Sequence, residues 1–431
     1  MNTSPVIALF PEASFGAALN CVGIAQELRR LGATPVFICH PGFTGVFAEY
    51  GFREYHLRDA APSSANEAED YWQSFISNQL AHFDLDPEAQ LPTYVGPTWD
   101  AIVDTVEAAE EGLEALLTRI KPDAILLDNV IMFPAIIRAG CPWVRVVSCA
   151  ETELPDAQVP PYLSGLEPGD KAACRRFEKA YLKATDAAHR RYNSFRKARG
   201  LDPLPPGNFL ETSNDLNLVL APTAVRYERK QPLSQPKFVF LEGCVRSETR
   251  FDPPQFPVED GPLIYMSFGS LGAIDTHLIE RMIDVFAAIP ARFLINVGGF
   301  LEAYERVPDN VFLGSWFPQP SVVAQSALFI HHGGNNSYCE ALYHGVPSLI
   351  MPYCWDGHDN AQRAHATGTG IAMHRSAWSP GELEKTVLSL LDDTAMHQRL
   401  MDIAKHMKAD PGTSRAATAV LEAIRSNGKR G

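Results

Sequence analysis

Short apolar runs alternate with amphipathic stretches in both halves of the chain. Residues 5–10 are almost all apolar, residues 17–31 place apolar side chains on one helical face, and residues 34–39 are again mostly apolar. Apolar strands that alternate with helices are typical of parallel sheets covered on both faces. The pattern therefore predicts a doubly wound α/β sheet, and its restart at residue 263 predicts a second one.

Two long helices and an insertion are predicted in the first half. The helices cover residues 99–120 and 170–199, and we expect their charged positions, such as Glu110 and Arg196, on solvated outer faces. Residues 60–98, which are polar with scattered proline and tryptophan, are expected to lie over the first sheet. The other predicted elements are strands at 52–57, 124–127, 143–148, 216–220, 238–241, 292–297 and 311–312, strands before His332 and Tyr353, and helices at 380–391 and 395–426.

One segment, residues 247–262, interrupts the alternation. It holds four prolines and has no apolar periodicity, which is typical of an exposed connection between domains. We therefore predict an N-terminal domain of residues 1–246 and a C-terminal domain of residues 263–410, joined by this linker. Residues 411–431 are expected to form a helix that packs back on the first domain.

Composition narrows the class of protein. The chain has 431 residues, of which 46% are hydrophobic and 20% charged, and its net charge of −14 argues against nucleic acid or an anionic membrane as a partner. The eight cysteines include no CxxC pair, which favours reduced thiols over disulfides or a structural zinc site. With no signal sequence and no long apolar run, we expect a soluble, cytoplasmic protein.

Polar and glycine-rich corners follow the predicted strands of the second half. They lie at residues 267–270, 332–337 and 356–360, and the carboxyl ends of parallel strands meet at one edge of a sheet. Free amide groups at a glycine corner before a helix favour an anion such as a phosphate. Glu340 follows Ser337 by about one helical turn and can accept hydrogen bonds from a ribose diol. Together these corners predict a sugar-nucleotide site.

The stretch from Trp316 to Ala361 resembles the donor-binding signature of the family-1, nucleotide-sugar-dependent glycosyltransferases of the GT-B fold. The matching motifs are W-x-P-Q, H-x-G-x-N-S, a glutamate three residues later, G-V-P and D-x-x-x-N-A. The resemblance implies two Rossmann-like domains that face each other across a cleft, with the acceptor in the N-terminal half. The motif residues are Trp316, Pro318, Gln319, His332, Gly334, Asn336, Ser337, Glu340, Gly345, Val346, Pro347, Asp356, Asn360 and Ala361.

The resemblance also implies roles for the donor-binding residues. It implies an inverting transfer from a UDP- or dTDP-sugar, used as a co-substrate, to a hydroxyl of a small molecule, without a metal or other cofactor. Phe317, Gly334 and Gly357 belong to the same donor-binding set. Trp316 would stack on the base, Gln319 would face the ribose, and Glu340 would hold the ribose hydroxyls. The diphosphate would be held by Ser270, His332, Asn336 and Ser337. Asp356 would bind the transferred sugar.

The sequence departs from the family pattern at two places. Gly357 stands where relatives carry a glutamine or histidine, which leaves the identity of the sugar open. The catalytic histidine of the first loop is also missing, since no histidine lies between residues 1 and 39. Asp128 matches the aspartate that orients that histidine in relatives and is the first candidate for the base, with Glu12 and Ser14 as alternatives.

Several alternatives stay open at this point. A sugar-nucleotide epimerase has the same architecture, and the missing histidine also fits a non-catalytic nucleotide-binding relative. Transfer to carbon or nitrogen, or to an acidic hydroxyl that needs little base, is a further possibility. The sequence is compatible with a monomer or a homodimer.

Overall fold

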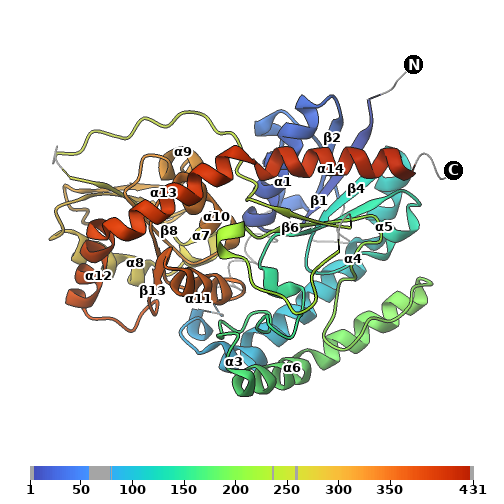
Figure 1. The fold of residues 1–431 in the computed structure, drawn as a ribbon, viewed down its shortest axis with the longest axis horizontal. Coiled ribbons are helices and arrows are strands. Elements are labelled where there is room, and N and C mark those ends of the chain that lie inside the picture. Colours follow the sequence, from blue (N-terminus) through green and yellow to red (C-terminus); the bar gives the residue numbers. More distant parts are fainter. Residues whose placement is uncertain (1–3, 58–77, 79, 235–236, 258–260, 428–431) are drawn as a thin grey trace.

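Two parallel sheets form the framework of the molecule (Figure 1). The computed structural model describes residues 4–57, 78, 80–234, 237–257 and 261–427. The first sheet has the order β3-β2-β1-β4-β5-β6-β7 and the second the order β10-β9-β8-β11-β12-β13, all neighbours being parallel. The prediction of two doubly wound α/β units is therefore confirmed.

The strands are short and mostly buried on both faces, as parallel strands between helical layers must be. The sequence pattern missed one strand, β13, which follows α11, has three residues and pairs with β12. The strands are β1 Val6–Pro11, β2 Thr34–Cys39, β3 Arg53–His56, β4 Ala124–Asp128, β5 Trp143–Val147, β6 Leu216–Leu220, β7 Phe238–Leu241, β8 Leu263–Ser267, β9 Arg292–Asn296, β10 Val311–Gly314, β11 Leu328–His331, β12 Ser348–Ile350 and β13 Gly370–Ala372.

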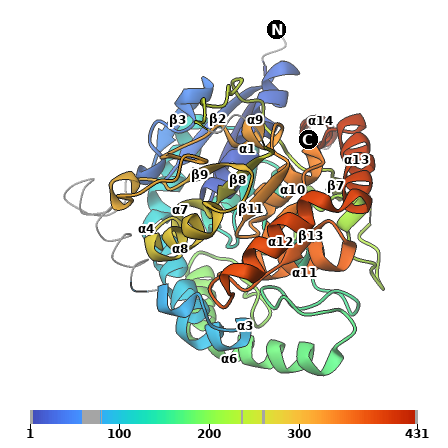
Figure 2. The same cartoon turned by 90° about the vertical axis from the view of Figure 1, so that its left-hand side faces the viewer.

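Helices cover both faces of each sheet, as the two views show (Figures 1 and 2). They are α1 Phe15–Arg30, α3 Pro87–Gln90, α4 Gly96–Ile120, α5 Pro134–Arg138, α6 Lys171–Ala198, α7 Gly269–Gly272, α8 Thr276–Phe286, α9 Gln319–Val323, α10 Asn335–His344, α11 Gly357–Thr367, α12 Pro380–Asp392, α13 Thr394–Ala409 and α14 Gly412–Asn427. Shorter 3-10 or π turns are η1 Pro41–Phe43, η2 Ala48–Tyr50, η3 Leu80–His82, η4 Leu91–Val95, η5 Glu151–Glu153, η6 Thr223–Val225 and η7 Leu301–Ala303.

Local sequence explains several helix ends. The Ser14 hydroxyl accepts from the amide of Ala17 at the start of α1, and Ser379 and Glu382 form a capping box at the start of α12. Pro411 lies between α13 and α14. It separates the two helices, because proline cannot continue the hydrogen-bond ladder of a helix. The predicted helical run 395–426 is therefore two helices.

Two charged positions that were predicted on solvated helix faces are buried, so that prediction was wrong for them. Glu110 of α4 is buried and forms an ion pair with Arg138 of α5 at 3.1 Å. Arg196 of α6 is buried and pairs with Glu211 at 2.8 Å. Periodicity identifies the apolar face of a helix but not whether a neighbouring element covers the other face.

The predicted insertion at residues 60–98 falls partly outside the described residues, at 60–77 and 79. Its described part forms short turns, and these lead into α4. The buried side chain of Gln90 donates to the main-chain oxygen of Tyr353 in the other sheet unit at 2.8 Å. The end of the insertion therefore contacts the second half of the chain.

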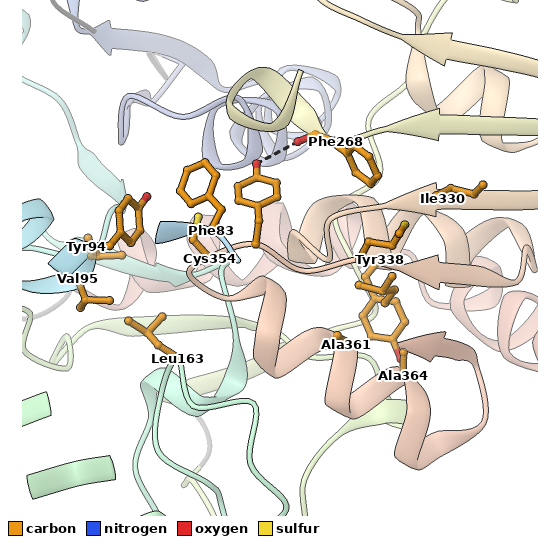
Figure 3. Close-up of a cluster of buried hydrophobic side chains, with 14 of the residues drawn as sticks. Phe83, Tyr94, Val95, Leu163, Phe268, Ile330, Tyr338, Cys354, Ala361 and Ala364 are labelled. Atoms are coloured by element: carbon orange, nitrogen blue, oxygen red, sulfur yellow. Dashed lines mark hydrogen bonds between the residues drawn. The ribbon is translucent and has the colours of Figure 1, made fainter. Parts of the chain in front are cut away.

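An apolar cluster is shared by the two halves. The ring of Phe83 lies 4.9 Å from that of Tyr353, and the ring of Trp99 lies 5.9 Å from that of Trp355. Figure 3 shows Tyr94, Val95 and Leu163 of the first half together with Cys354 and Ala361 of the second. We call this boundary between the two sheet units the seam. Burial of apolar area across the seam holds the two units together.

The C-terminal helix α14 crosses back onto the first sheet unit (Figure 1). It packs against α1, β6 and β7, and its side chains of Ala416, Ala417 and Val420 are buried there. A membrane span needs about 20 consecutive apolar residues, and none of the helices in the described part of the chain combines that length with that hydropathy.

The crossing of α1, the end of β7 and the start of α14 generates a first prediction. A methyl group at Gly23 would lie 2.7 Å from the main-chain oxygen of Cys244 and 3.1 Å from the Thr413 side chain. Gly23→Ala should therefore lower the free energy of unfolding by about 1–3 kcal/mol, measured by urea titration. Gly381→Ala is the matched control, because that helical position faces open space and gains helix propensity. Equal stability of the two variants would contradict the close packing.

Candidate active site

Two helix N-termini meet at one edge of the second sheet. The chain leaves β11 at His331 and enters α10 at Asn335, and it leaves β12 and enters α11 at Gly357. The Asp356 carboxylate joins them, because Oδ2 accepts from the Asn335 amide at 2.9 Å and from the Asn360 side chain at 3.1 Å. Burial raises the pKa of Asp356 well above its ordinary value, and the nearby charge of Asp359 adds to the shift.

His332 lies in the corner between β11 and α10. Its ring stacks on Tyr353 with centroids 5.1 Å apart, and burial lowers its pKa to about 4, so the imidazole is neutral. Its Nδ1 atom is buried and has no hydrogen-bond partner among the described residues. A methyl group on Gly269 would lie 3.1 Å from the ring, and one on Gly334 would lie 2.7 Å from Nε2. Glycines at these positions leave His332 and the adjoining amides accessible to a ligand.

Ser270 and Gly357 border the same corner. Ser270 follows Gly269 in α7 and is exposed, so its hydroxyl is free for a ligand. Gly357 is buried, and a methyl group there would lie 2.5 Å from the His332 main-chain oxygen. The missing side chain at position 357 therefore allows the two corners to touch.

Glu340 is fully buried, at 0% exposure, and both of its oxygens already accept hydrogen bonds. Gln319 donates to Oε2 at 2.8 Å, and Asn336 donates to Oε1 at 3.2 Å. Gln319 also donates to the Ser337 hydroxyl at 3.1 Å. The structure thus brings four predicted donor-binding residues together. A ribose that binds Glu340 must share or replace these partners.

Arg246 completes this cluster and was not predicted. Its Nη1 lies 2.9 Å from Glu340 Oε1, and its Nε lies 2.5 Å from Glu248, which also accepts from the Tyr50 hydroxyl at 2.6 Å. Burial raises the pKa of Glu340, and the charge of Arg246 opposes that shift. No local pattern around residue 246 predicts its contacts with Glu340 and Tyr50, because these residues are 94 and 196 positions away.

Trp316 and Phe317 differ although they are neighbours. The Trp316 side chain is 55% exposed and is therefore available to stack on a ligand. The Phe317 side chain is buried against Tyr265 and Phe251. Only the main chain of Phe317 remains available to contact a bound nucleotide sugar.

Glu12 and Asp128 lie at the ends of β1 and β4 in the first sheet. The Glu12 amide donates to the Asp128 main-chain oxygen at 2.8 Å, and Glu12 Oε1 accepts from Ser14 at 2.7 Å. Glu12 as a whole is partly exposed, but its carboxyl group is buried, and this burial raises its pKa to about 7. The hydrogen bond from Ser14 lowers the pKa, and the charge of Glu153 raises it.

Asp128 is enclosed, with 2% exposure. Its Oδ1 accepts from Ser148 at 2.5 Å, and the Cys21 thiol lies 3.8 Å from its Oδ2. Burial raises the pKa of Asp128 well above its ordinary value, and the charge of Glu12 adds to this. Because Asp128 is enclosed and both of its oxygens have partners inside the protein, a ligand has little access to it.

Tyr162 and Glu153 were not predicted as site residues. Burial raises the pKa of Tyr162, with contributions from the charges of Cys149, Glu153 and Asp356. Hydrogen bonds connect the carboxyl groups of the two sheet units: the Asn335 amide donates to Asp356, the Asn335 side chain donates to the Ser148 main-chain oxygen, and the Ser148 hydroxyl donates to Asp128.

The described residues contain one group with metal-ligand geometry, made by Cys39, Glu54 and His56. None of the candidate donor-binding residues belongs to it. Glu54 already accepts from the amides of Gly45, Phe47 and Ala48, so its carboxylate has a structural role.

Comparison with known proteins gives matches over both the sequence and the fold. Residues 280–423 match the model of the erythromycin biosynthesis protein CIII-like C-terminal domain. Oleandomycin glycosyltransferase of Streptomyces antibioticus is 23% identical over 425 residues, which cover 97% of this chain and 91% of that protein. The uncharacterized UDP-glucosyltransferase YojK of Bacillus subtilis is 22% identical over 201 residues, 45% of this chain and about half (50%) of that protein.

Among solved structures, the glycotransferase of kitacinnamycin superposes with a TM-score of 0.71 at 20% identity, covering 98% of this chain and 100% of that one. Such a likeness at low identity concerns the fold. It confirms the predicted GT-B arrangement of the two sheet units.

The buried cluster around Glu340 generates a second prediction. Arg246→Met leaves the carboxylates of Glu340 and Glu248 buried without their cation, and it should lower the free energy of unfolding by about 3–5 kcal/mol. Arg250→Met is the matched control on the same segment, because the Arg250–Asp252 pair is exposed to solvent and should contribute little. A loss of stability that is equally small in both variants, measured by urea unfolding, would show that the Arg246 cluster is not a structural link.

Proposed function

We propose that this chain, which belongs to the family-1 nucleotide-sugar-dependent glycosyltransferases, transfers a sugar from a UDP- or dTDP-sugar to a hydroxyl group of a small natural-product acceptor. One observation supports the proposal most strongly: hydrogen bonds connect the start of α10 to the end of the first sheet that carries Glu12. Asn335, whose amide binds Asp356, donates its side chain to the Ser148 main-chain oxygen at 2.8 Å, and the Ser148 hydroxyl donates to Asp128, whose main-chain oxygen accepts from the Glu12 amide at 2.8 Å. The pKa of Glu12 is about 7, so an acceptor hydroxyl between Glu12 and the Asp356 corner would have a base on one side and the donor on the other.

The geometry of the second sheet edge supports the donor half of the proposal. In this proposal the diphosphate binds the corner between β11 and α10, where His332 and the helix start supply N–H groups. Ser270 adds a hydroxyl from α7. Trp316 stacks on the base, Glu340 and Gln319 face the ribose, and Asp356 accepts from a hydroxyl of the sugar.

We assign the base to Glu12 rather than to Asp128. Glu12 takes the proton from the acceptor hydroxyl, the acceptor oxygen forms a bond to the anomeric carbon, and the bond to the diphosphate oxygen breaks. The electron pair of that bond leaves with the nucleoside diphosphate. A base whose pKa lies near neutrality is well matched to this step. Enclosed Asp128 would hold Glu12 in place through its main-chain oxygen.

The finer features of the reaction belong to the same proposal. A single displacement at the anomeric carbon inverts its configuration. The donor site uses N–H groups and side chains, so no metal or other cofactor is needed to hold the diphosphate. We further propose that the protein acts in the cytoplasm as a monomer or homodimer. The relatives found are named as transferases, so nothing supports the epimerase alternative.

A screen of UDP- and dTDP-sugars against hydroxylated small molecules, read by mass spectrometry, tests the proposed activity. The expected result is a glycoside together with an equal amount of nucleoside diphosphate, with and without a chelator. Formation of an isomeric nucleotide sugar without acceptor would indicate an epimerase. Nucleotide binding without any turnover across the screen would indicate a non-catalytic binding protein.

Ribose recognition by Glu340 predicts a specific loss of nucleotide affinity. Glu340→Gln should weaken UDP binding at least about tenfold in calorimetry, because a charged acceptor for the ribose hydroxyls is lost. The loss should be smaller for 2′-deoxy-UDP, which has one hydroxyl fewer. Glu302→Gln, at an exposed position, is the control. Unchanged affinity for UDP in Glu340→Gln would contradict the ribose assignment.

Assignment of the base to Glu12 predicts the pH dependence of transfer. Protonated Glu12 cannot accept a proton, so kcat/KM should fall as the pH drops through about 7 and reach a plateau above it. Glu12→Gln should lower kcat/KM by roughly 100- to 10,000-fold and remove this dependence. Asp128→Asn should keep the inflection. If the inflection persists in Glu12→Gln and disappears in Asp128→Asn, Asp128 is the base.

A further inference from the structure

A carboxylate of the second sheet unit binds a loop of the first. Asp359 lies in the first turn of α11 and is buried, and its Oδ2 accepts from the Thr152 hydroxyl at 2.7 Å and from the Leu163 amide at 2.8 Å. Its Oδ1 accepts from the Gly165 amide at 2.8 Å. We call residues 161–166 the Tyr162 loop. Asp359 thus holds this loop by accepting hydrogen bonds from two of its main-chain amides across the seam.

The backbone of the Tyr162 loop is not one that its sequence favours by itself. Leu163 has φ = +69° and Gly165 has φ = +59°, both in the left-handed region. Leucine rarely adopts this conformation, because its Cβ crowds the backbone, so surrounding contacts must hold it. A methyl group at Gly165 would lie 3.1 Å from both Cβ and the main-chain oxygen of His358 in α11. The loop therefore packs closely against the start of α11.

The Tyr162 loop places the side chain of Tyr162 beside Trp355 of the second sheet unit. The hydroxyl oxygen of Tyr162 is buried and has no hydrogen-bond partner among the described residues. Its ring meets that of Trp355 edge-on at 6.4 Å, and Trp355 itself has φ = +55° directly before Asp356. The raised pKa keeps the Tyr162 hydroxyl protonated, so it is a donor, and Asp356 is among the groups that raise it. A buried donor without a partner indicates a place for a ligand oxygen.

We propose that Tyr162 is an acceptor-binding residue, donating its hydroxyl hydrogen to an oxygen of the acceptor, and that Asp359 is the residue that positions it. This inference rests on the proposed glycosyl transfer. Figure 3 shows Leu163, the neighbour of Tyr162, in the shared apolar cluster with Val95 and Ala361, so the loop is anchored on both sides.

The same helical turn then serves both substrates. Asp356, proposed to hold the donor sugar, and Asp359, which holds the acceptor loop, are three residues apart at the start of α11. Movement of α11 would change both contacts together. The proposed acceptor site therefore depends on residues of both sheet units.

Hydrogen exchange of the whole chain tests the positioning role without any acceptor. In Asp359→Asn, deuterium uptake should rise at residues 161–166, while uptake at residues 332–337 should stay as in the natural protein. Asp84→Asn is the matched control, because Asp84 also makes an ion pair across the seam, with Arg375, but does not touch the Tyr162 loop. Unchanged uptake at residues 161–166 in Asp359→Asn would overturn the positioning role.

Kinetics with the acceptor that the screen returns test the role of Tyr162. Tyr162→Phe should lower kcat/KM for that acceptor at least tenfold, with the dissociation constant for UDP or dTDP within twofold of its normal value. Asp359→Asn should act in the same direction and raise the KM for acceptor. Wild-type acceptor kinetics in Tyr162→Phe, or an equal loss of nucleotide affinity, would overturn the assignment. Absence of turnover in the unmodified protein would instead refute the proposed function, and hydrogen exchange would still decide whether Asp359 holds the loop.

Discussion

The polar seam between the starts of α10 and α11 and the first sheet unit is the constraint on which the site depends. Asn335 donates to the main-chain oxygens of Ser148 and Leu220, at 2.8 and 3.1 Å, and Asp359 accepts from the Tyr162 loop. These partners satisfy polar groups that would otherwise be buried without hydrogen bonds. The seam fixes the donor corner and the first sheet edge in one geometry, and transfer between them needs that geometry.

Crowded carboxyl groups give this seam its chemistry. Glu12, Asp128, Glu153 and Asp356 are buried or partly buried near one another, and their pKa values are all raised, chiefly by burial. Glu153 is offset by Arg145 at 3.1 Å, whereas Glu12 has only the Ser14 hydroxyl as a close side-chain partner in the hydrogen bonds described. Burial, with a smaller contribution from the charge of Glu153, raises the pKa of Glu12 to about 7, which suits proton transfer. In the proposed mechanism, the carboxylate of Glu12 takes the role of the histidine expected from the family pattern.

The parts of the molecule that depend on local sequence could be predicted, and the parts that depend on distant partners could not. The corners at His332 and Asp356 follow from strand, glycine and helix-start signals within a few residues, and the two sheets follow from apolar runs. The contact of Arg246 with Glu340 and that of Asp359 with Gly165 join residues 94 and 194 positions apart. Burial of Glu110 likewise depends on α5 covering α4. Such pairings need the tertiary arrangement, because no periodicity in one segment records its neighbour.

The proposed reaction is a direct displacement across the seam, with Glu12 as the base and the donor held at the second sheet edge. The anomeric configuration of the product, read from the proton coupling in its nuclear magnetic resonance spectrum, is the decisive measurement. With an α-configured nucleotide-sugar donor, direct displacement gives a β-glycoside, since the acceptor oxygen attacks opposite the departing diphosphate. An α-glycoside would contradict it, because retention requires a second displacement or a different geometry of attack.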